Sequence, residues 1–167
     1  VEESLGDKTE FDVVQGMKKM GTYAHPNFST NDKLEIMATD VPILVIAGNV
    51  FDSHKVVNDF NALKRIADDM LKNGFNQLAV IAEKYTLDVM NYALGNKMKG
   101  IFFFYLLKTP ALQPEEIEDM AIYTGAKLLD QNKPNAWKNY DWRDLGKAQK
   151  LIVTKEYINI HGGNGSE

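Results

Sequence analysis

The sequence contains no cysteine, and this absence excludes disulfide bonds and thiolate metal sites within the chain. Long hydrophobic runs are also absent: the longest, residues 101–107, is far shorter than the roughly 20 residues that a membrane-spanning helix needs. Lysines and arginines are scattered, and the formal net charge of -4 at pH 7 disfavours a nucleic-acid-binding protein. We therefore expect a cytoplasmic protein with neither a membrane nor a nucleic-acid partner.

The motifs of common enzymes are missing as well. The sequence has no glycine-rich dinucleotide or P-loop fingerprint and no G-x-S-x-G nucleophile elbow. Its three histidines, His25, His54 and His161, lie far apart and form no metal-ligand pattern. The acidic cluster at residues 115–119 suits the first turn of a helix better than a general-acid pair. We expect no catalytic residue, no metal and no cofactor in this chain.

What the sequence does contain is a globular composition, with 44% hydrophobic and 25% charged residues. Its length of 167 residues fits one domain, residues 1–167. Because the chain begins at Val1, without an initiator methionine or a signal peptide, we expect it to be a fragment of a longer protein.

Apolar runs and helix-end signals alternate along the chain. Short apolar runs predict buried strands at residues 41–47, 78–82, 101–107, 151–154 and 157–160. Three helices are expected between them: from Ser53 to Gly74, from Thr86 to Gly100, and from Gln113 to Gly125.

This alternation of helix and strand predicts an α/β fold with a mainly parallel sheet flanked by helices. Residues 9–37 are rich in turn signals and predict a smaller antiparallel layer. Residues 131–144 predict a surface loop that carries Trp137, Tyr140 and Trp142.

The first two helices have more apolar surface than docking onto one sheet requires. The apolar residues of the first, from Val56 to Leu71, cover about half of its circumference. Those of the second separate into two groups on nearly opposite sides: Leu87, Met90, Leu94 and Met98, and Val89, Tyr92 and Ala93. The spare edges either pack against each other inside the domain or form an open groove. An open groove with flexible methionines such as Met70, Met90 and Met98 would bind many partners.

Several segments resemble the apical domain of group I, GroEL-like chaperonins. Residues 144–155 read D-L-G-K-A-Q-K-L-I-V-T-K, and the family's closing segment reads D-L-G-x-A-x-x-[VL]-x-[IV]-x-K. Shorter matches occur in the family's order at residues 13–17 (V-V-Q-G-M), 81–83 (I-A-E), 98–100 (M-K-G) and 108–110 (K-T-P). Together they cover nearly the whole chain, and the chain resembles a divergent member of this family.

The resemblance implies that the domain binds non-native polypeptide in an apolar groove between two helices, beside an extended segment. The family's extended segment corresponds to residues 23–28, where Tyr23 and Phe28 are kept. In the first helix the groove positions fall on Leu63 and Ile66, or one residue later on Lys64 and Ala67. The substrate-binding residues implied by the resemblance are Tyr23, Phe28, Leu63, Ile66, Met70, Met90, Leu94 and Asn96.

The resemblance also implies properties of the complete protein. ATP and magnesium would act in a separate domain, so the full-length chaperonin would be an ATPase although this fragment is not an enzyme. The full-length protein would form a homo-oligomeric ring that can take a co-chaperonin lid, whereas the fragment would be monomeric. Gly95 and Asn27 stand where the family has apolar groove residues, which argues against recognition of a standard lid.

Two other functions remain open at the sequence level. The same apolar surface could serve one dedicated partner in an interaction module. Alternatively, a flavodoxin-like domain could bind a small ligand at the carboxyl ends of its parallel strands. The second reading needs converging polar loops, and the sequence offers only Asn49, Glu83 and Lys108 there.

Overall fold

The computed structural model describes residues 16–47 and 56–164, with the side chains of the first helix described from residue 61 onward. The elements in chain order are β1 (Met17–Met20), β2 (Thr22–Tyr23), the 3-10 helix η1 (Pro26–Phe28), β3 (Ile36–Ala47), α2 (Val56–Lys72), β4 (Gln77–Ala82), α3 (Leu87–Lys99), β5 (Phe103–Lys108), α4 (Pro114–Thr124), β6 (Leu129–Asp130), the 3-10 helix η2 (Trp142–Asp144), β7 (Gly146–Val153) and β8 (Tyr157–Gly163). No helix in the described ranges is long and apolar enough to cross a membrane.

The predicted helix ends are confirmed for α3 and α4. Thr86 caps α3 by accepting a hydrogen bond from the Val89 amide at 3.4 Å, and Gly100 ends the helix in the left-handed conformation. At the start of α4, a Glu116 carboxylate oxygen accepts from the Gln113 amide at 3.1 Å, and Gly125 ends the helix. The predicted cap Ser53 lies outside the described residues.

The sheet is mixed, so the prediction of a mainly parallel sheet is wrong. Parallel pairing is confined to β3–β4, β4–β5 and β3–β6, whereas β3–β7, β7–β8, β1–β8 and β2–β5 are antiparallel. The antiparallel strands do not form a separate layer either, because they continue the same sheet in the order β1-β8-β7-β3-β4-β5-β2. β3 makes this possible: it pairs with β7 along one edge and with β4 along the other.

The two edges of this sheet belong to one short segment of chain. β1 pairs with β8 at one end of the strand order, β2 pairs with β5 at the other end, and only Gly21 separates them. A Cβ atom at Gly21 would lie 2.6 Å from the Lys108 carbonyl oxygen and 2.7 Å from the Ile158 side chain. Glycine is therefore required where the chain crosses from one half of the sheet to the other.

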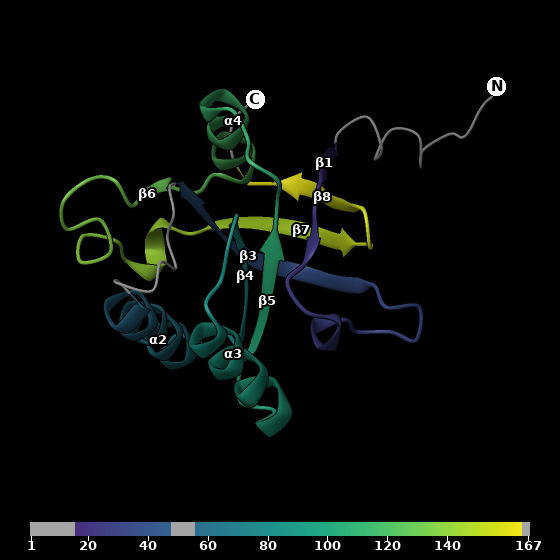
Figure 1. Cartoon of the computed structure of the whole chain (residues 1–167), viewed down its shortest axis with the longest axis horizontal. Coiled ribbons are helices and arrows are strands. Elements are labelled where there is room, and N and C mark those ends of the chain that lie inside the picture. The colour runs from purple at the N-terminus through teal and green to yellow at the C-terminus, as the bar shows by residue number, and fades with distance from the viewer. Residues whose placement is uncertain (1–15, 48–55, 165–167) are drawn as a thin grey trace.

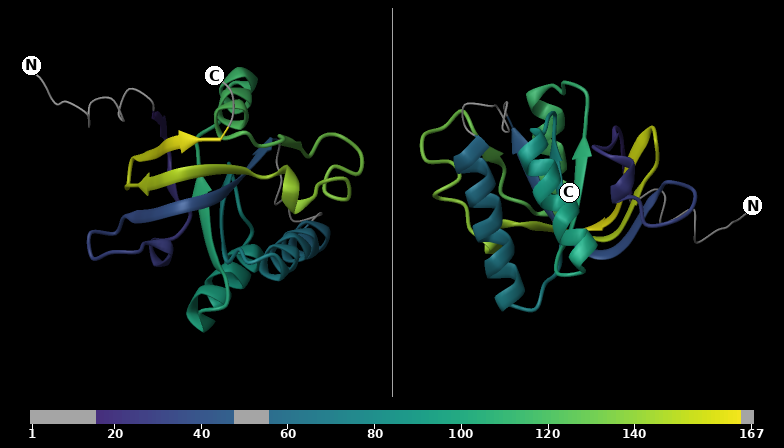
Figure 2. Two further views of the ribbon diagram at one scale, coloured as in Figure 1. Left: turned by 180° about the vertical axis from the view of Figure 1, so that it is seen from behind. Right: turned by 60° about the horizontal axis from the view of Figure 1, so that its bottom comes forward.

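The helices cover different parts of this sheet (Figure 1). α3 packs against β5, and α2 lies beside α3. α4 packs on the other side of the molecule, against β3, β7 and β8. Figure 2 shows α2 and α3 side by side, and its left view shows α4 at the opposite end of the molecule. The two helices that carry the predicted groove are thus neighbours.

The segment between β6 and η2 is anchored more firmly than a surface loop. Trp137 and Tyr140 are 8% and 2% exposed, so the prediction that they lie on the surface is wrong. The Tyr140 hydroxyl donates to the Lys127 carbonyl at 2.7 Å, and Arg65 of α2 donates to the Trp137 and Tyr140 carbonyls at 3.0 and 2.7 Å. These bonds satisfy buried polar groups, which lets the aromatic rings join the core.

Candidate functional site

The apolar residues that α2 was expected to expose are in the core. Leu63, Ile66 and Met70 are each 0% exposed, so the prediction that they line an open groove is wrong. They lie three or four positions apart and form the stripe by which α2 docks onto the sheet. In the alternative register Lys64 is exposed, whereas Ala67 is also buried.

The extended segment before β3 is also more buried than expected. Phe28 is 0% exposed and Tyr23 is 8% exposed, and both belong to the core, so neither is an exposed contact residue. The η1 turn that carries Phe28 begins at His25, whose Nδ1 accepts from the Asn27 amide at 3.0 Å. The exposed residues of this segment are instead Pro26 and Asn27.

The two apolar groups of α3 differ in burial, as the sequence predicts. Val89 and Ala93 are 0% exposed and face the core. On the other side, Leu87 is 72% exposed and Met98 is 88% exposed. The predicted exposure of this side of α3 is confirmed.

Met90 and Leu94 lie in the same stripe as Leu87 and Met98 and are half-buried against the core. The stripe is continuous because its members are spaced three or four residues apart along the helix.

Asn96 is not part of this stripe. Its side-chain amide donates to the Tyr92 carbonyl at 2.9 Å on its own helix. Burial, with the nearby carboxylate of Asp68 on α2, raises the pKa of Tyr92 to about 12. Tyr92 and Asn96 therefore mark the side of α3 that faces α2, away from Leu87 and Met98.

A hollow of about 480 Å³ lies between α3 and the segment that leads into β3. Its lining residues are Pro26, Asn27, Ser29, Leu34, Leu94, Lys97 and Met98. Leu34 is 38% exposed and has a positive φ of 60°, which is uncommon for a leucine and directs it out of the turn. Sequence reasoning missed Leu34, and also Ser29 and Lys97, because nothing in the local sequence marks these residues as neighbours of one hollow.

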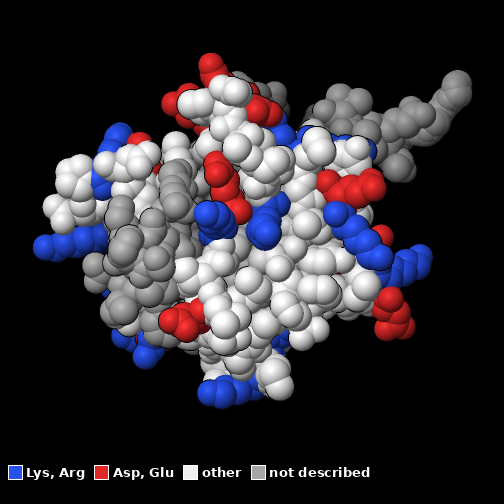
Figure 3. Space-filling model, in the orientation of Figure 1, with Lys and Arg blue, Asp and Glu red and all other residues white. Residues whose placement is uncertain are grey.

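We call the exposed stripe of α3 and the apolar wall opposite it the α3 surface. It consists of Leu87, Met90, Leu94, Met98, Pro26 and Leu34. Figure 3 shows an area without acidic or basic side chains over α3 and the region beside it, with basic side chains at its lower margin. This surface lies on the η1 side of α3 and not between α2 and α3.

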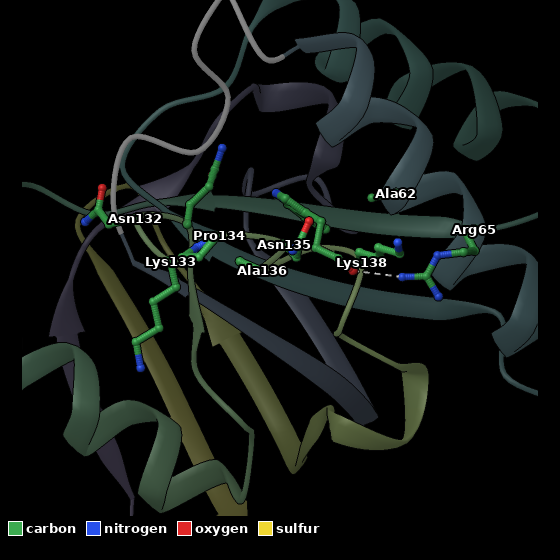
Figure 4. A pocket seen from close by; sticks show the side chains of 10 residues that line it. Ala62, Arg65, Asn132, Lys133, Pro134, Asn135, Ala136 and Lys138 are labelled. Atoms are coloured by element: carbon green, nitrogen blue, oxygen red, sulfur yellow. Dashed lines mark hydrogen bonds between the residues drawn. The ribbon is translucent and has the colours of Figure 1, made fainter.

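A second hollow, of about 620 Å³, lies beside α2 and the 131–138 segment (Figure 4). Its charged lining side chains, Arg65, Lys133 and Lys138, are all basic. Arg65 nevertheless points to the backbone of the segment and donates to the Trp137 carbonyl at 3.0 Å, and Lys133 lies at the opposite end of the hollow. The cations do not converge, so this hollow is a poor site for a small anion.

Among the described residues, the carboxyl ends of β4 and β5 offer no ligand site. The Tyr85 hydroxyl donates to the Val80 carbonyl at 2.9 Å and to the Leu107 carbonyl at 2.6 Å, so it bonds to the backbone of both β4 and β5. Burial raises the pKa of this hydroxyl, which keeps it protonated as a donor. Glu83 and Lys108 are exposed, and Asn49 lies outside the described residues. This arrangement argues against the flavodoxin-like reading.

No group of three or more histidines and carboxylates that could hold a metal ion occurs among residues 16–47 and 56–164.

Comparison with solved structures shows a chaperonin-like fold. The chain superposes with a TM-score of 0.64 on the chaperonin gp146 from bacteriophage EL 2 (Pseudomonas aeruginosa), solved as a crystal structure in the presence of ATP-BeFx. The two sequences are 15% identical, and the match covers 90% of this chain but only 29% of the phage chaperonin. No protein-family model matches the sequence.

Proposed function

We propose that this chain is the client-binding domain of a chaperonin-like protein and holds non-native polypeptide on the α3 surface. The observation that carries the proposal is the exposure of Leu87 and Met98 on a helix that buries Val89 and Ala93 on its opposite side. These two exposed side chains add little to the docking of the helix, because Val89 and Ala93 are buried in the core and Met90 and Leu94 pack against it. The likeness in fold to a phage chaperonin supports the same reading.

The chemistry of the α3 surface suits many clients and does not select one. Leucine and methionine contribute apolar area, and the unbranched methionine side chain adapts to irregular partners. Contiguous exposed apolar area is uncommon on soluble monomers and typically marks an interaction site. A client could lie along the stripe as an amphipathic helix, or place single apolar side chains in the hollow beside Leu94. Both modes need only apolar side chains, which unfolded chains expose.

The properties of the complete protein are part of the same proposal. This chain corresponds to less than a third of the phage chaperonin's length. ATP and magnesium would bind in another domain, and ATP hydrolysis there would release the client. This domain would have no catalytic role. Assembly into a homo-oligomeric ring in the cytoplasm would raise the affinity for clients, because linked weak sites gain effective concentration. A co-chaperonin lid would compete for the same surface.

The test measures how well the domain suppresses aggregation of several unrelated denatured proteins. We expect the domain to slow aggregation of all of them, and the double variant Leu87→Glu with Met98→Glu to lose this effect. A matched control is the double variant Met20→Glu with Ile122→Glu, because these residues are 65% and 51% exposed but lie on β1 and α4. The control carries the same added charge and should keep the activity.

Two results would contradict the proposal. Equal activity of both double variants would show that the α3 surface is not the binding surface. Suppression of aggregation for one protein in the panel, and for no other, would identify an interaction module with a dedicated partner.

A further inference from the structure

Lys97 brings a positive charge to the hollow beside α3. It is the one formally charged residue among those that line this hollow. It follows Leu94 by three positions and directly precedes Met98, so its ammonium group lies beside the apolar stripe. The position next to two client-contact residues makes it a candidate for determining which clients bind.

The ammonium group of Lys97 is held by backbone carbonyls. Its Nζ donates to the Asn27 carbonyl and, at 2.9 Å, to the Ser29 carbonyl. An ammonium group has three N–H donors, and the described residues supply two acceptors. These bonds hold the charge beside the hollow and join η1 and the residue that follows it to α3.

No carboxylate neutralises this charge within the described residues. The ion pairs found there join Lys19 to Glu116, Arg65 to Asp69 and Arg143 to Asp141, and none involves Lys97. Partial burial lowers the pKa of Lys97, which shows that its charged form is less well solvated than that of an exposed lysine. A carboxylate is the partner that an ammonium group in this situation binds best.

We propose that Lys97 makes the α3 surface prefer apolar client segments that carry a carboxylate beside the apolar side chain. The apolar side chain would occupy the hollow near Leu94 and Leu34, and the carboxylate would bind the Lys97 ammonium. An aspartate or glutamate side chain and a free chain terminus offer the same chemistry. This inference rests on the proposed function, because it assigns a preference to the same surface.

Matched short fluorescent peptides test the preference by fluorescence anisotropy. One leucine-rich peptide carries glutamate beside leucine, a second carries glutamine there, and both are amidated at the C-terminus. A third has glutamine and a free C-terminal carboxylate, which separates the two sources of the charge. We expect the glutamate peptide to bind at least about fivefold more tightly than the glutamine peptide, as a partly buried charged hydrogen bond would give.

Variants of the domain assign the effect to Lys97. Lys97→Met keeps most of the aliphatic chain and should bind the glutamate and glutamine peptides equally. Lys97→Arg should restore the preference for glutamate. Lys99→Met is the matched control, because Lys99 lies on the same helix but does not line the hollow, and it should behave as wild type.

Because Lys97→Met can also loosen the segment after η1, a second measurement uses the wild-type domain alone. Added sodium chloride should reduce the preference for the glutamate peptide and leave binding of the glutamine peptide almost unchanged.

The outcomes separate this inference from the proposed function. If the wild-type domain binds the glutamate and glutamine peptides with equal affinity, the preference is absent while the proposed function stands. A preference that persists in Lys97→Met, or that does not respond to salt, overturns the role of Lys97. Failure of every peptide to bind would overturn the preference and the proposed function together.

Discussion

Helices α2 and α3 are neighbours, yet their apolar residues are arranged and buried differently. α2 buries Leu63, Ile66 and Met70 completely. α3 buries Val89 and Ala93 and leaves Leu87 and Met98 exposed. A wide but continuous apolar arc can be accommodated in a core. Two separate apolar groups on one helix cannot face the same sheet, so the second group remains on the surface.

Each of the two helices also uses one basic side chain to hold the backbone of an irregular segment. α2 uses Arg65 to hold the backbone of the segment between β6 and η2. α3 uses Lys97 to hold the segment after η1. Each helix therefore fixes one irregular segment, and the segment held by α3 lies beside the exposed Met98 and Leu34.

The sharpest test of this difference is Leu63→Ala in α2. We expect it to lower the free energy of unfolding by about 3 kcal/mol, because it leaves a cavity among fully buried side chains. Urea denaturation measures the change, and Leu71→Ala on the same helix is the control, because Leu71 is 38% exposed. A loss below about 1 kcal/mol for Leu63→Ala would show that α2 packs less tightly than its burial indicates.

The bond between α2 and the segment before η2 should have the next largest effect. Arg65→Met removes the donor to the Trp137 and Tyr140 carbonyls and should destabilise the domain by about 1.5 kcal/mol. Lys64→Met alters the adjacent exposed cation and should leave the urea midpoint nearly unchanged. If the two variants unfold at the same midpoint, Arg65 does not anchor this segment.

The cap of α3 should matter less than the anchor on α2. Thr86→Ala removes the acceptor of the Val89 amide and should reduce stability by about 1 kcal/mol, whereas Thr86→Ser should keep it. Thermal unfolding followed by circular dichroism compares the three proteins. Equal melting temperatures for Thr86→Ala and wild type would mean that the docking of α3 on β5 alone holds the start of the helix.

The smallest effects on stability are expected at the exposed stripe of α3. Leu87→Glu and Met98→Glu should each change the free energy of unfolding by no more than about 0.5 kcal/mol, because both side chains already lie in water. Met90→Glu should be clearly more destabilising, because Met90 is half-buried against the core. A large loss of stability in Met98→Glu would make the stripe part of the core and remove the contrast between the helices.

Local sequence signals predicted the helices and strands well. Thr86 and Gly100 bound α3, and Gln113 and Gly125 bound α4, because hydrogen bonding at helix ends depends on side chains a few residues away. The apolar run at residues 41–47 gave the buried half of β3. Whether neighbouring strands pair parallel or antiparallel was harder to predict, because a buried strand has the same apolar sequence pattern in both arrangements.

The exposure of apolar side chains was predicted correctly for one side of α3 and wrongly for α2. The opposed groups on α3 leave one side exposed whatever packs against the other, and the exposed side is the one expected. On α2 the resemblance allowed two registers, and the choice of the apolar pair Leu63 and Ile66 placed core residues in the groove. Leu34 could not be found in advance, since its place beside Leu94 depends on how β3 and η1 meet α3.

The sequence by itself determined where α3 and α4 begin and end and that α3 keeps apolar side chains in water, because helical periodicity and end capping are local properties. Only the tertiary structure decided that Leu63, Ile66 and Met70 of α2 are buried, that the sheet is mixed with its two edge strands joined through Gly21, and that the open hollow lies on the η1 side of α3. These features depend on contacts between residues far apart in the chain, and the local pattern of side chains does not specify such contacts.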